Sequence, residues 1–277
     1  MSDELLQLDG ADGPEQKHAV LAAGDVHAFT CRAPDKDSEN EDTVAVIPFG
    51  PQAAIFVVAD GAGGLPAGKR ASATAVSALR ASVQVALDET MLLRTAILDG
   101  IEEANAAVKN LANGSATTLT VVAIEGRMAR AYQIGDSEAL VVGQRGLIKM
   151  QTTAHSPTGF AVEAGFLNEK EALHHEDRHL VSNFLGTPDM RIDVGTEVEM
   201  RPCDTLLLAS DGLMDNVHTE EIIERIRKGP LGDAMERLIT LAQRRMTGAA
   251  AGQPSKPDDL SVILFRKRRN KARAESL

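Results

Sequence analysis

Short apolar runs recur along the chain, and their length and composition predict β-strands rather than helices. Several of them follow one another closely with only turn residues between, as in "IEGRMA" and "GDSE". Such short connections favour antiparallel pairing over a repeated strand–helix–strand winding. The predicted strands are residues 43–47, 53–60, 117–124, 129–135, 138–143, 204–210 and 260–265.

Longer stretches with small and apolar residues at helical spacing predict four helices. Two long helices follow the second predicted strand, and a shorter pair precedes the last strand. This order predicts an α+β fold, in which helices cover the outer faces of two packed antiparallel sheets. The predicted helices are residues 67–87, 91–111, 220–228 and 231–246.

The chain has 277 residues, 43% of them hydrophobic, and we favour one large domain over two small ones. We place an acidic tail at residues 1–20, the domain at residues 21–266 and a basic tail at residues 267–277. The basic tail either contacts an anionic partner or is a solvated, disordered end. Residues 152–181 show no clear period, so we expect an irregular flap over the sheet ends, as functional segments often are.

Composition excludes several classes of protein. No apolar run reaches the length of about 18 residues needed to span a bilayer, and the acidic start does not resemble a signal peptide, so we expect a cytoplasmic protein. The formal net charge of -11 argues against binding to nucleic acid, because phosphate backbones require a basic face. Two cysteines, Cys31 and Cys203, match neither a disulfide framework nor a thiolate metal site.

Acidic residues stand at five predicted strand ends. A lone acid at such a position is usually a turn former or a helix cap. Glycine adjoins three of these acids, in "ADGAGG", "IGDS" and "SDGL", and glycine lets backbone carbonyls approach a bound ion. The acids are Glu41, Asp42, Asp60, Asp136, Asp211, Asp258 and Asp259.

Carboxylates without matching Cys or His clusters are the donor set of a hard divalent cation, so we predict Mg²⁺ or Mn²⁺ rather than Zn²⁺. If these acids converged without a cation, their repulsion would raise their pKa values and destabilise the fold.

Six strings occur in this order along the chain: "ENEDTVAV", "FVVADGAGGLPAGKRAS", "ATTLTVVAI", "AYQIGDSEALVV", "LLLASDGLMDNV" and "PDDLSVILF". Together they resemble the type 2C, or PPM, family of metal-dependent protein serine/threonine phosphatases, over residues 28–265. The resemblance implies an α-β-β-α sandwich with a two-metal centre at one end of the sheets. Two such ions would lower the pKa of a bridging water and neutralise phosphate, so that hydroxide attacks phosphorus without a protein nucleophile. The implied partner is a phosphorylated protein that is the target of a Ser/Thr kinase or is itself such a kinase, with neither nucleic acid nor membrane involved.

The resemblance also implies roles for individual residues. Asp60 would bridge two metal ions, which makes it both a ligand and a catalytic residue. Glu41 and the carbonyl of Gly61 would bind one of these ions. Asp211 and Asp258 would bind the other.

Three further acids have less direct roles. Asp42 would be a catalytic residue that holds metal-bound water. Asp136, together with Asp211, matches the place where some members of the family hold a third, weaker metal. Asp259 stands where the family usually has Asn, so the ligand role is assigned to Asp258, and an exchange between these two neighbours is the alternative.

The chain departs from the family at two positions. Asp37 stands where the family commonly has an arginine that holds phosphate, and Arg32 and Lys36 are the candidate replacements. Ala62 stands where some members have a histidine that protonates the leaving alcohol, and a metal-bound water is the alternative acid. These departures leave open a non-catalytic regulatory or phosphoprotein-binding module. A hydrolase of another phosphoester also stays open, although the intact acids favour the protein phosphatase.

Three histidines in "HHEDRH", His174, His175 and His179, suggest a metal site. The same string resembles the stretch between the flap and the next core strand of the family. We therefore interpret these histidines as structural, because histidine often serves in packing and hydrogen bonding.

Overall fold

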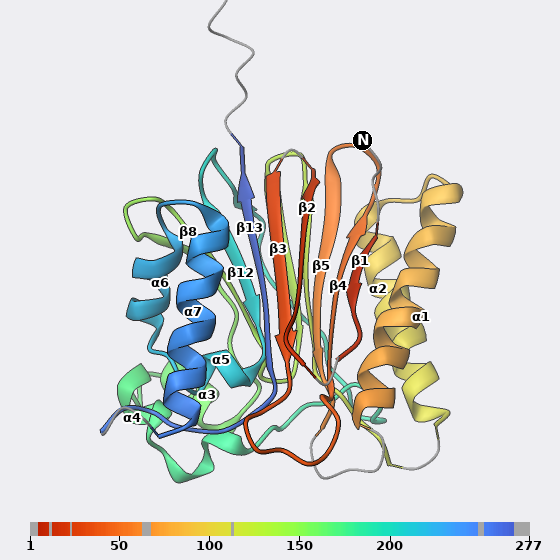
Figure 1. Cartoon of the computed structure of the whole chain (residues 1–277). Coiled ribbons are helices and arrows are strands. Elements are labelled where there is room, and N and C mark those ends of the chain that lie inside the picture. Colours follow the sequence, from red (N-terminus) through yellow and green to blue (C-terminus); the bar gives the residue numbers. More distant parts are fainter. Residues whose placement is uncertain are drawn as a thin grey trace, which may run out of the picture.

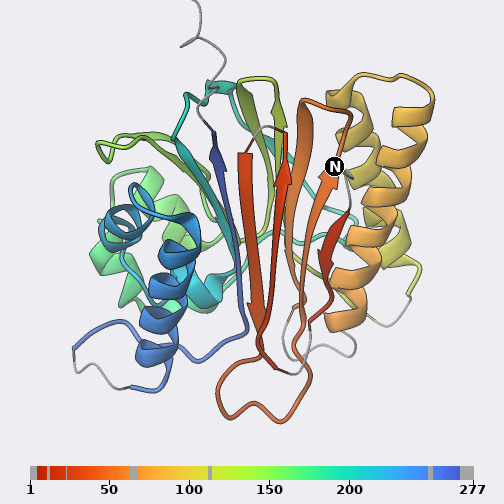
Figure 2. The ribbon, with the colours of Figure 1, turned by 45° about the horizontal axis from the view of Figure 1, so that its top comes forward.

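The computed structural model of the chain describes residues 5–10, 13–22, 24–62, 68–111, 114–248 and 252–268. Two antiparallel sheets pack face to face, and helices cover the outer face of each sheet (Figure 1). A second viewpoint shows the same arrangement, with one helical layer on each side of the paired sheets (Figure 2). The predicted α+β sandwich is confirmed.

The first sheet has seven strands in the order β1-β4-β5-β6-β7-β10, and β11 also pairs with β7. All of its neighbouring strands are antiparallel. Its strands are β1 (Leu6–Leu8), β4 (Asp42–Pro48), β5 (Ala53–Asp60), β6 (Leu119–Glu125), β7 (Met128–Ile134), β10 (Asp193–Val194) and β11 (Val198–Glu199).

The second sheet has six strands in the order β2-β3-β13-β12-β8-β9, again with antiparallel neighbours. The last strand of the described chain, β13, therefore lies in the middle of this sheet, between β3 and β12. Its strands are β2 (Glu15–Leu21), β3 (Gly24–Cys31), β8 (Glu138–Val142), β9 (Ile148–Gln151), β12 (Thr205–Ala209) and β13 (Leu260–Lys267).

Helices α1 (Gly68–Asp88) and α2 (Leu93–Lys109) cover the first sheet, while α6 (Thr219–Ile226) and α7 (Leu231–Met246) cover the second. A short helix, α5 (Asp211–Met214), follows β12 directly. No helix in the described part of the chain is both long and apolar enough to cross a membrane.

Strand β5 shows how the sequence sets up these layers. Its residues Phe56 and Val58 pack in the cluster between the two sheets, which we call the interlayer. The alternate residues Ile55 and Val57 pack in the cluster under α1 and α2. Successive strand residues point to opposite faces, and both faces are covered here, so the strand reads as a continuous apolar run.

Strands of the sandwich extend beyond the predicted domain at both ends. The expected acidic tail at residues 1–20 contains β1 and most of β2, so the sandwich begins well before residue 21. The strands are short or polar on their outward side, and their apolar pattern is correspondingly weak. At the other end β13 extends to Lys267, Arg268 pairs with Asp25, and the remaining residues of the predicted basic tail lie outside the described ranges.

The predicted flap at residues 152–181 contains three short helices: α3 (Pro157–Glu163), α4 (Glu169–Leu173) and the 3-10 helix η1 (Glu176–His179). They are too short to show a helical period. Polar capping residues, rather than an apolar period, mark where α3 and α4 begin. Ser156 caps α3 by accepting a hydrogen bond from the backbone of Gly159, and Asn168 and Glu171 form a capping box on α4.

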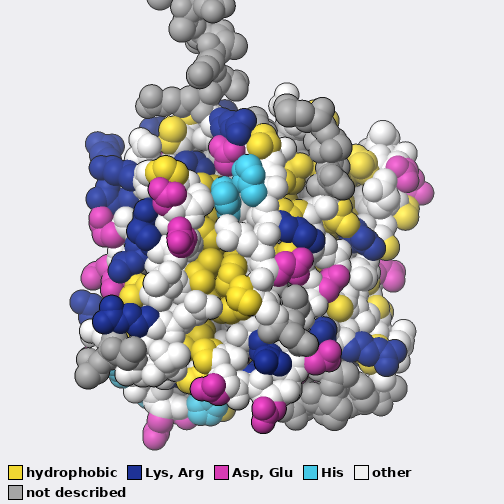
Figure 3. Space-filling view, viewed as in Figure 1, with side chains coloured by type: hydrophobic (Ala, Val, Ile, Leu, Met, Phe, Trp, Pro, Cys, Tyr) yellow, Lys and Arg dark blue, Asp and Glu magenta, His cyan; other side chains and the backbone are white. Residues whose placement is uncertain are grey.

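Charge is unevenly distributed over the surface. On the face seen in Figure 3, Lys and Arg side chains gather on the side that α6 and α7 cover, although the net charge of the chain is -11. Many acids therefore lie elsewhere, and several of them meet at the end of the interlayer.

Candidate metal centre

Two acids stand at the end of the interlayer, at the first residue of β4 and the last residue of β5, and these strand ends lie at the lower edge of the sheets in Figure 1. Asp60 continues the side of β5 that carries Phe56 and Val58, and the strand register pairs it with Asp42 of β4. Asp42 is fully buried, and neither of its carboxylate oxygens has a hydrogen-bond partner among the described residues. The alternation that builds the core therefore delivers carboxylates to its edge.

Glycine is required beside these acids because backbone segments come very close. A Cβ atom on Gly61 would overlap the backbone of Gly68, where α1 begins. A Cβ atom on Gly212 would overlap the carbonyl of Asp259. The two glycines thus let the ends of β5 and β12 approach the segments that carry the other acids.

All six predicted ligand positions line one pocket of about 650 Å³. They come from the loop before β4, the end of β5, the turn after β7, the start of α5 and the loop before β13. Residues of the flap and Thr118 complete the wall. The six positions are Glu41, Asp60, Gly61, Asp136, Asp211 and Asp258.

The carboxylates are close enough to perturb one another. Burial, followed by the charges of Asp42 and Asp211, raises the pKa of Asp60 well above its ordinary value. Burial and Asp211 also raise the pKa of Asp136, and they raise that of Asp258 to about 7. A bound cation would relieve this repulsion, and the oxygen-only donor set fits a hard divalent ion.

Two lysines reach into the same cluster. The Lys36 ammonium lies 2.9 Å from Glu41 and 2.7 Å from Asp259. The Lys256 ammonium contacts Asp211 and Asp258. In the described ranges, no three Asp, Glu, His or Cys side chains surround a single point as metal ligands would, so an incoming ion must share or displace these lysine contacts.

The neighbours Asp258 and Asp259 have different surroundings. Asp259 is buried, and its carboxylate accepts hydrogen bonds from the backbone of Ala33 at 2.8 Å and of Glu41 at 2.8 Å. It therefore holds the loop between β3 and β4 in place. Asp258 lies in the pocket with a more exposed side chain, and this difference supports the ligand role for Asp258.

The two candidate phosphate-binding residues also differ in their position relative to the pocket. Lys36 lines the pocket, whereas Arg32 is not among the described residues of its wall. Asp37, at the position of the family's arginine, is exposed and is likewise not among them. Ala62 lies in the wall, where it offers no proton donor.

The histidines of the flap have mixed roles. His175 caps η1 by accepting a hydrogen bond from the backbone of Asp177 at 3.1 Å, which fits the structural interpretation. His174 packs its ring near that of His218. His179 instead lines the acid-lined pocket, at the edge contributed by the flap.

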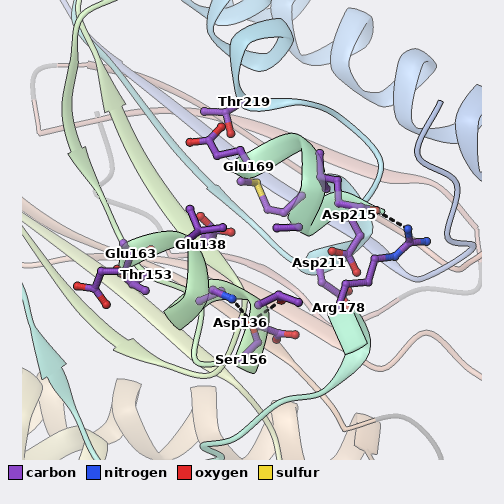
Figure 4. A pocket seen from close by; sticks show the side chains of 18 of the residues that line it. Asp136, Glu138, Thr153, Ser156, Glu163, Glu169, Arg178, Asp211, Asp215 and Thr219 are labelled. Carbon is purple, nitrogen blue, oxygen red and sulfur yellow. Dashed lines mark hydrogen bonds between the residues drawn. The ribbon is translucent and has the colours of Figure 1, made fainter. Parts of the chain in front are cut away.

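A second pocket, of about 320 Å³, lies under the flap and shares Asp136 and Asp211 with the first (Figure 4). Glu138, at the start of β8, belongs to its wall, and burial raises the pKa of this carboxyl to about 8. Arg178 of η1 enters from the flap side. The acidic region thus extends beyond the predicted ligands.

Two residues of this region were not predicted from the sequence. Asp215 follows Asp211 at one helical turn, so the "SDGLMD" string places both acids on one side of α5. That spacing is a usable signal. Lys256 stands in a loop of small and polar residues, and its sequence context gives no hint that its ammonium reaches the acids.

Residues 33–247 match the family model described as protein phosphatase 2C. Among curated proteins, the chain is 32% identical over 197 residues to the protein phosphatase PhpP of Streptococcus pneumoniae, which covers 68% of this chain and 79% of that protein. The segment that matches the family model contains five of the six predicted ligand positions, all except Asp258.

Solved structures give the same result. The serine/threonine phosphatase PstP/Ppp of Mycobacterium tuberculosis superposes with a TM-score of 0.72 at 27% identity, over 88% of this chain and 98% of that chain. The catalytic domain of a serine/threonine phosphatase PstP in complex with two manganese ions superposes with a TM-score of 0.68 at 25% identity, over 92% and 100% of the two chains.

Proposed function

The chain belongs to the protein phosphatase 2C family, and we propose that its acid-lined pocket is the metal centre of the enzyme. The activity is the metal-dependent removal of phosphate from phosphoserine and phosphothreonine in proteins. The observation that carries the proposal is the convergence of five separate chain segments, each bearing an acid, on one pocket.

The donors suit two Mg²⁺ or Mn²⁺ ions. Asp60, the Gly61 carbonyl, Glu41, Asp211 and Asp258 are the residues that would hold these ions. The Oδ1 atom of Asp211 is buried without a hydrogen-bond partner in the described part of the chain, as an oxygen reserved for an ion would be. When bound, the ions supply Lewis-acid activation of water and neutralise phosphate charge.

Other residues prepare the site for phosphate. Asp42, buried beside Asp60, is the proposed acceptor that orients the attacking water. Lys36 is the proposed phosphate contact, because its ammonium is the one candidate cation in the pocket wall on the side of Glu41 among the described residues. Burial raises the pKa of the Cys31 thiol to about 11, so it does not act as a nucleophile.

The proposed physiological substrate is a protein phosphorylated by a Ser/Thr kinase, or such a kinase itself, in the cytoplasm. Acids on the metal side of the pocket argue against a purely phosphate-binding module, because uncompensated carboxylates repel a phosphoprotein. A pocket kept only for recognition would have no use for five buried or partly buried carboxylates.

The test is hydrolysis of a phosphothreonine peptide in the presence of Mn²⁺. We expect Asp60→Asn and Asp211→Asn each to lower the rate by roughly 100-fold or more, because metal catalysis supplies several kcal/mol and about 1.4 kcal/mol is tenfold. Asp99→Asn is the matched control. It makes the same chemical change on the exposed face of α2 and should leave the rate unchanged.

Equal rates in the wild type and both pocket variants would refute the enzyme. Activity on para-nitrophenyl phosphate combined with none on phosphopeptides would assign the pocket to a different phosphoester.

A further inference from the structure

The pocket of about 320 Å³ beneath the flap, which we call the under-flap pocket, carries a strong excess of acids. Figure 4 shows their side chains around the space between the flap, the start of β8 and the end of α5. Among the described residues of this wall, Arg178 is the one Lys or Arg side chain. The acids are Asp136, Glu138, Glu163, Glu169, Asp211 and Asp215.

The cations of the chain near this pocket leave part of the negative charge uncompensated. The guanidinium of Arg178 donates hydrogen bonds to the backbone carbonyls of Leu173 and Ser255, so it ties the flap to the loop before β13. Lys256 lies beside the pocket, where its ammonium contacts Asp211 and lies 2.9 Å from Asp215. The acids of α5 therefore have a cationic partner, whereas those at the start of β8 depend on other contacts.

Asp136 and Glu138 are these two acids on the sheet side. Asp136 is only 7% exposed, and within the described residues the one hydrogen bond to its carboxylate comes from its own backbone N–H. Glu138 is contacted by the neutral amide of Gln151. A largely buried carboxylate without a cationic partner costs free energy, so this pair marks a place for a positively charged ligand.

The rest of the wall suits a ligand with an aliphatic part. Val162, Ala172 and Leu173 line the pocket from the flap, and Met214 lines it from α5. Ligand pockets span about 300–1,000 Å³, so this one, at the lower end, fits a single long side chain better than a nucleotide or cofactor. Arginine and lysine have the matching composition, because an apolar stem carries their charged end.

The under-flap pocket adjoins the acid-lined pocket proposed as the metal centre. Asp136 and Asp211 belong to the walls of both. A polypeptide whose phosphate lies at the metal centre would therefore place its neighbouring side chains at the entrance of the under-flap pocket.

From this arrangement we infer that the under-flap pocket binds an arginine or lysine side chain of the phosphoprotein, close in sequence to the phosphorylated residue. Asp136 and Glu138 bind the charged end of that side chain, and the apolar wall covers its stem. The inference rests on the function proposed above and narrows the substrate to phosphorylation sites with a basic neighbour. The kinase that supplies such a substrate must itself accept basic residues beside the hydroxyl that it phosphorylates.

The experiment measures kcat/KM in saturating Mn²⁺ for a series of phosphothreonine peptides. Each peptide carries one arginine, at one of the three positions on either side of the phosphothreonine, and its partner carries citrulline there. Citrulline keeps the shape of arginine and removes its charge. At one of these positions we expect the arginine peptide to be better by roughly 10-fold, because a hydrogen bond to a charged group has about this value. The gain should lie mainly in KM, since the contact is remote from the reacting atoms.

Glu138→Gln is the test variant, because Glu138 is not a proposed metal ligand, whereas Asp136 also matches a metal position of the family. The variant should bring the ratio between the arginine and citrulline peptides close to one. Glu176→Gln is the matched control, because it makes the same change at an exposed residue of the flap that belongs to neither pocket wall. It should keep the ratio of the wild type.

The peptide series on the wild type is decisive without any variant. Equal kcat/KM for arginine and citrulline at every position would overturn the inference while leaving the phosphatase intact. A ratio that persists in Glu138→Gln, or that is lost equally in Glu176→Gln, would also overturn it. No hydrolysis of any phosphopeptide by the wild type would refute the proposed function, and the inference with it.

Discussion

The apolar middle of the interlayer and its acidic end are made by the same strands and differ in almost everything else. Toward the middle, Phe56 of β5 and Phe265 of β13 pack with their ring centroids 5.1 Å apart, and both are fully buried. At the lower end the same face of the first sheet presents Asp42 and Asp60. One alternation of side chains therefore builds both a core and a site.

The comparison shows that burial can stabilise or destabilise the folded state, depending on the chemistry of the side chain. Burying the two phenylalanines removes apolar surface from water and stabilises the fold. Burying the carboxylates costs free energy, and their raised pKa values are the sign of that cost. The apolar middle of the interlayer thus supplies the stability that keeps the acidic end assembled.

The largest effect on stability is expected in the apolar middle of the interlayer. Phe56→Ala should lower the free energy of unfolding by about 3–5 kcal/mol, because it leaves a cavity between two sheets that cannot close easily. Urea denaturation followed by circular dichroism measures this loss. The variant should still bind Mn²⁺ at temperatures where it is folded, and loss of Mn²⁺ binding in the folded variant would show that the two regions are not independent.

A medium effect is expected from a partly buried acid that is not a proposed ligand. Glu138 has a folded pKa of about 8 against an ordinary 4.5, so the folded state holds the extra proton between these values. The stability of the metal-free protein should therefore fall as pH rises from about 5 to 8.5, by about 2 kcal/mol once solvent screening is allowed for.

Glu138→Gln should remove that part of the pH dependence, because the amide does not titrate. The measurement is the free energy of unfolding in EDTA at the two pH values, for the variant and the wild type. An equal slope in both proteins would mean that other acids of the cluster carry the whole effect.

The smallest expected effect is an increase in stability. In EDTA at neutral pH, Asp60→Asn should raise the free energy of unfolding by about 1 kcal/mol, since it removes a partly buried carboxylate that Asp42 and Asp211 repel. With saturating Mn²⁺ the order should reverse, because only the wild type gains full binding energy. A variant that is less stable than the wild type in EDTA would show that Asp60 contributes structural contacts which its repulsion does not outweigh.

Much of the sandwich could be predicted from local pattern. The bounds of β5 and α7 agree with the prediction to the residue, because each has a strong apolar signal and a clear turn or proline at its edge. The strands β1, β2, β9, β10 and β11 were missed because they are short or polar. The strand β3 was also missed, because Asp25, His27 and Thr30 interrupt its apolar pattern. Their pairing depends on a neighbouring strand that is distant in the sequence.

The residues of the site likewise fall into those that the sequence predicted and those that it did not. The acids were visible because each follows or precedes a strong strand and adjoins glycine or another acid. Lys256 was not, because a long flexible side chain can reach any of several neighbours and only the folded loop, clamped by Asn216, decides which. The different duties of Asp258 and Asp259 also required the structure, since adjacent identical residues look alike in a sequence.

The central position of β13 has a consequence for the order in which the protein becomes an enzyme. Asp259 ties the loop that carries Glu41, although 218 residues separate the two in the chain. During synthesis the ribosome releases Glu41 and Asp60 long before Asp258 and Asp259. A nascent chain therefore holds an incomplete set of acids until the segment that carries Asp258 and Asp259 has been synthesised and β13 can pair with β3 and β12.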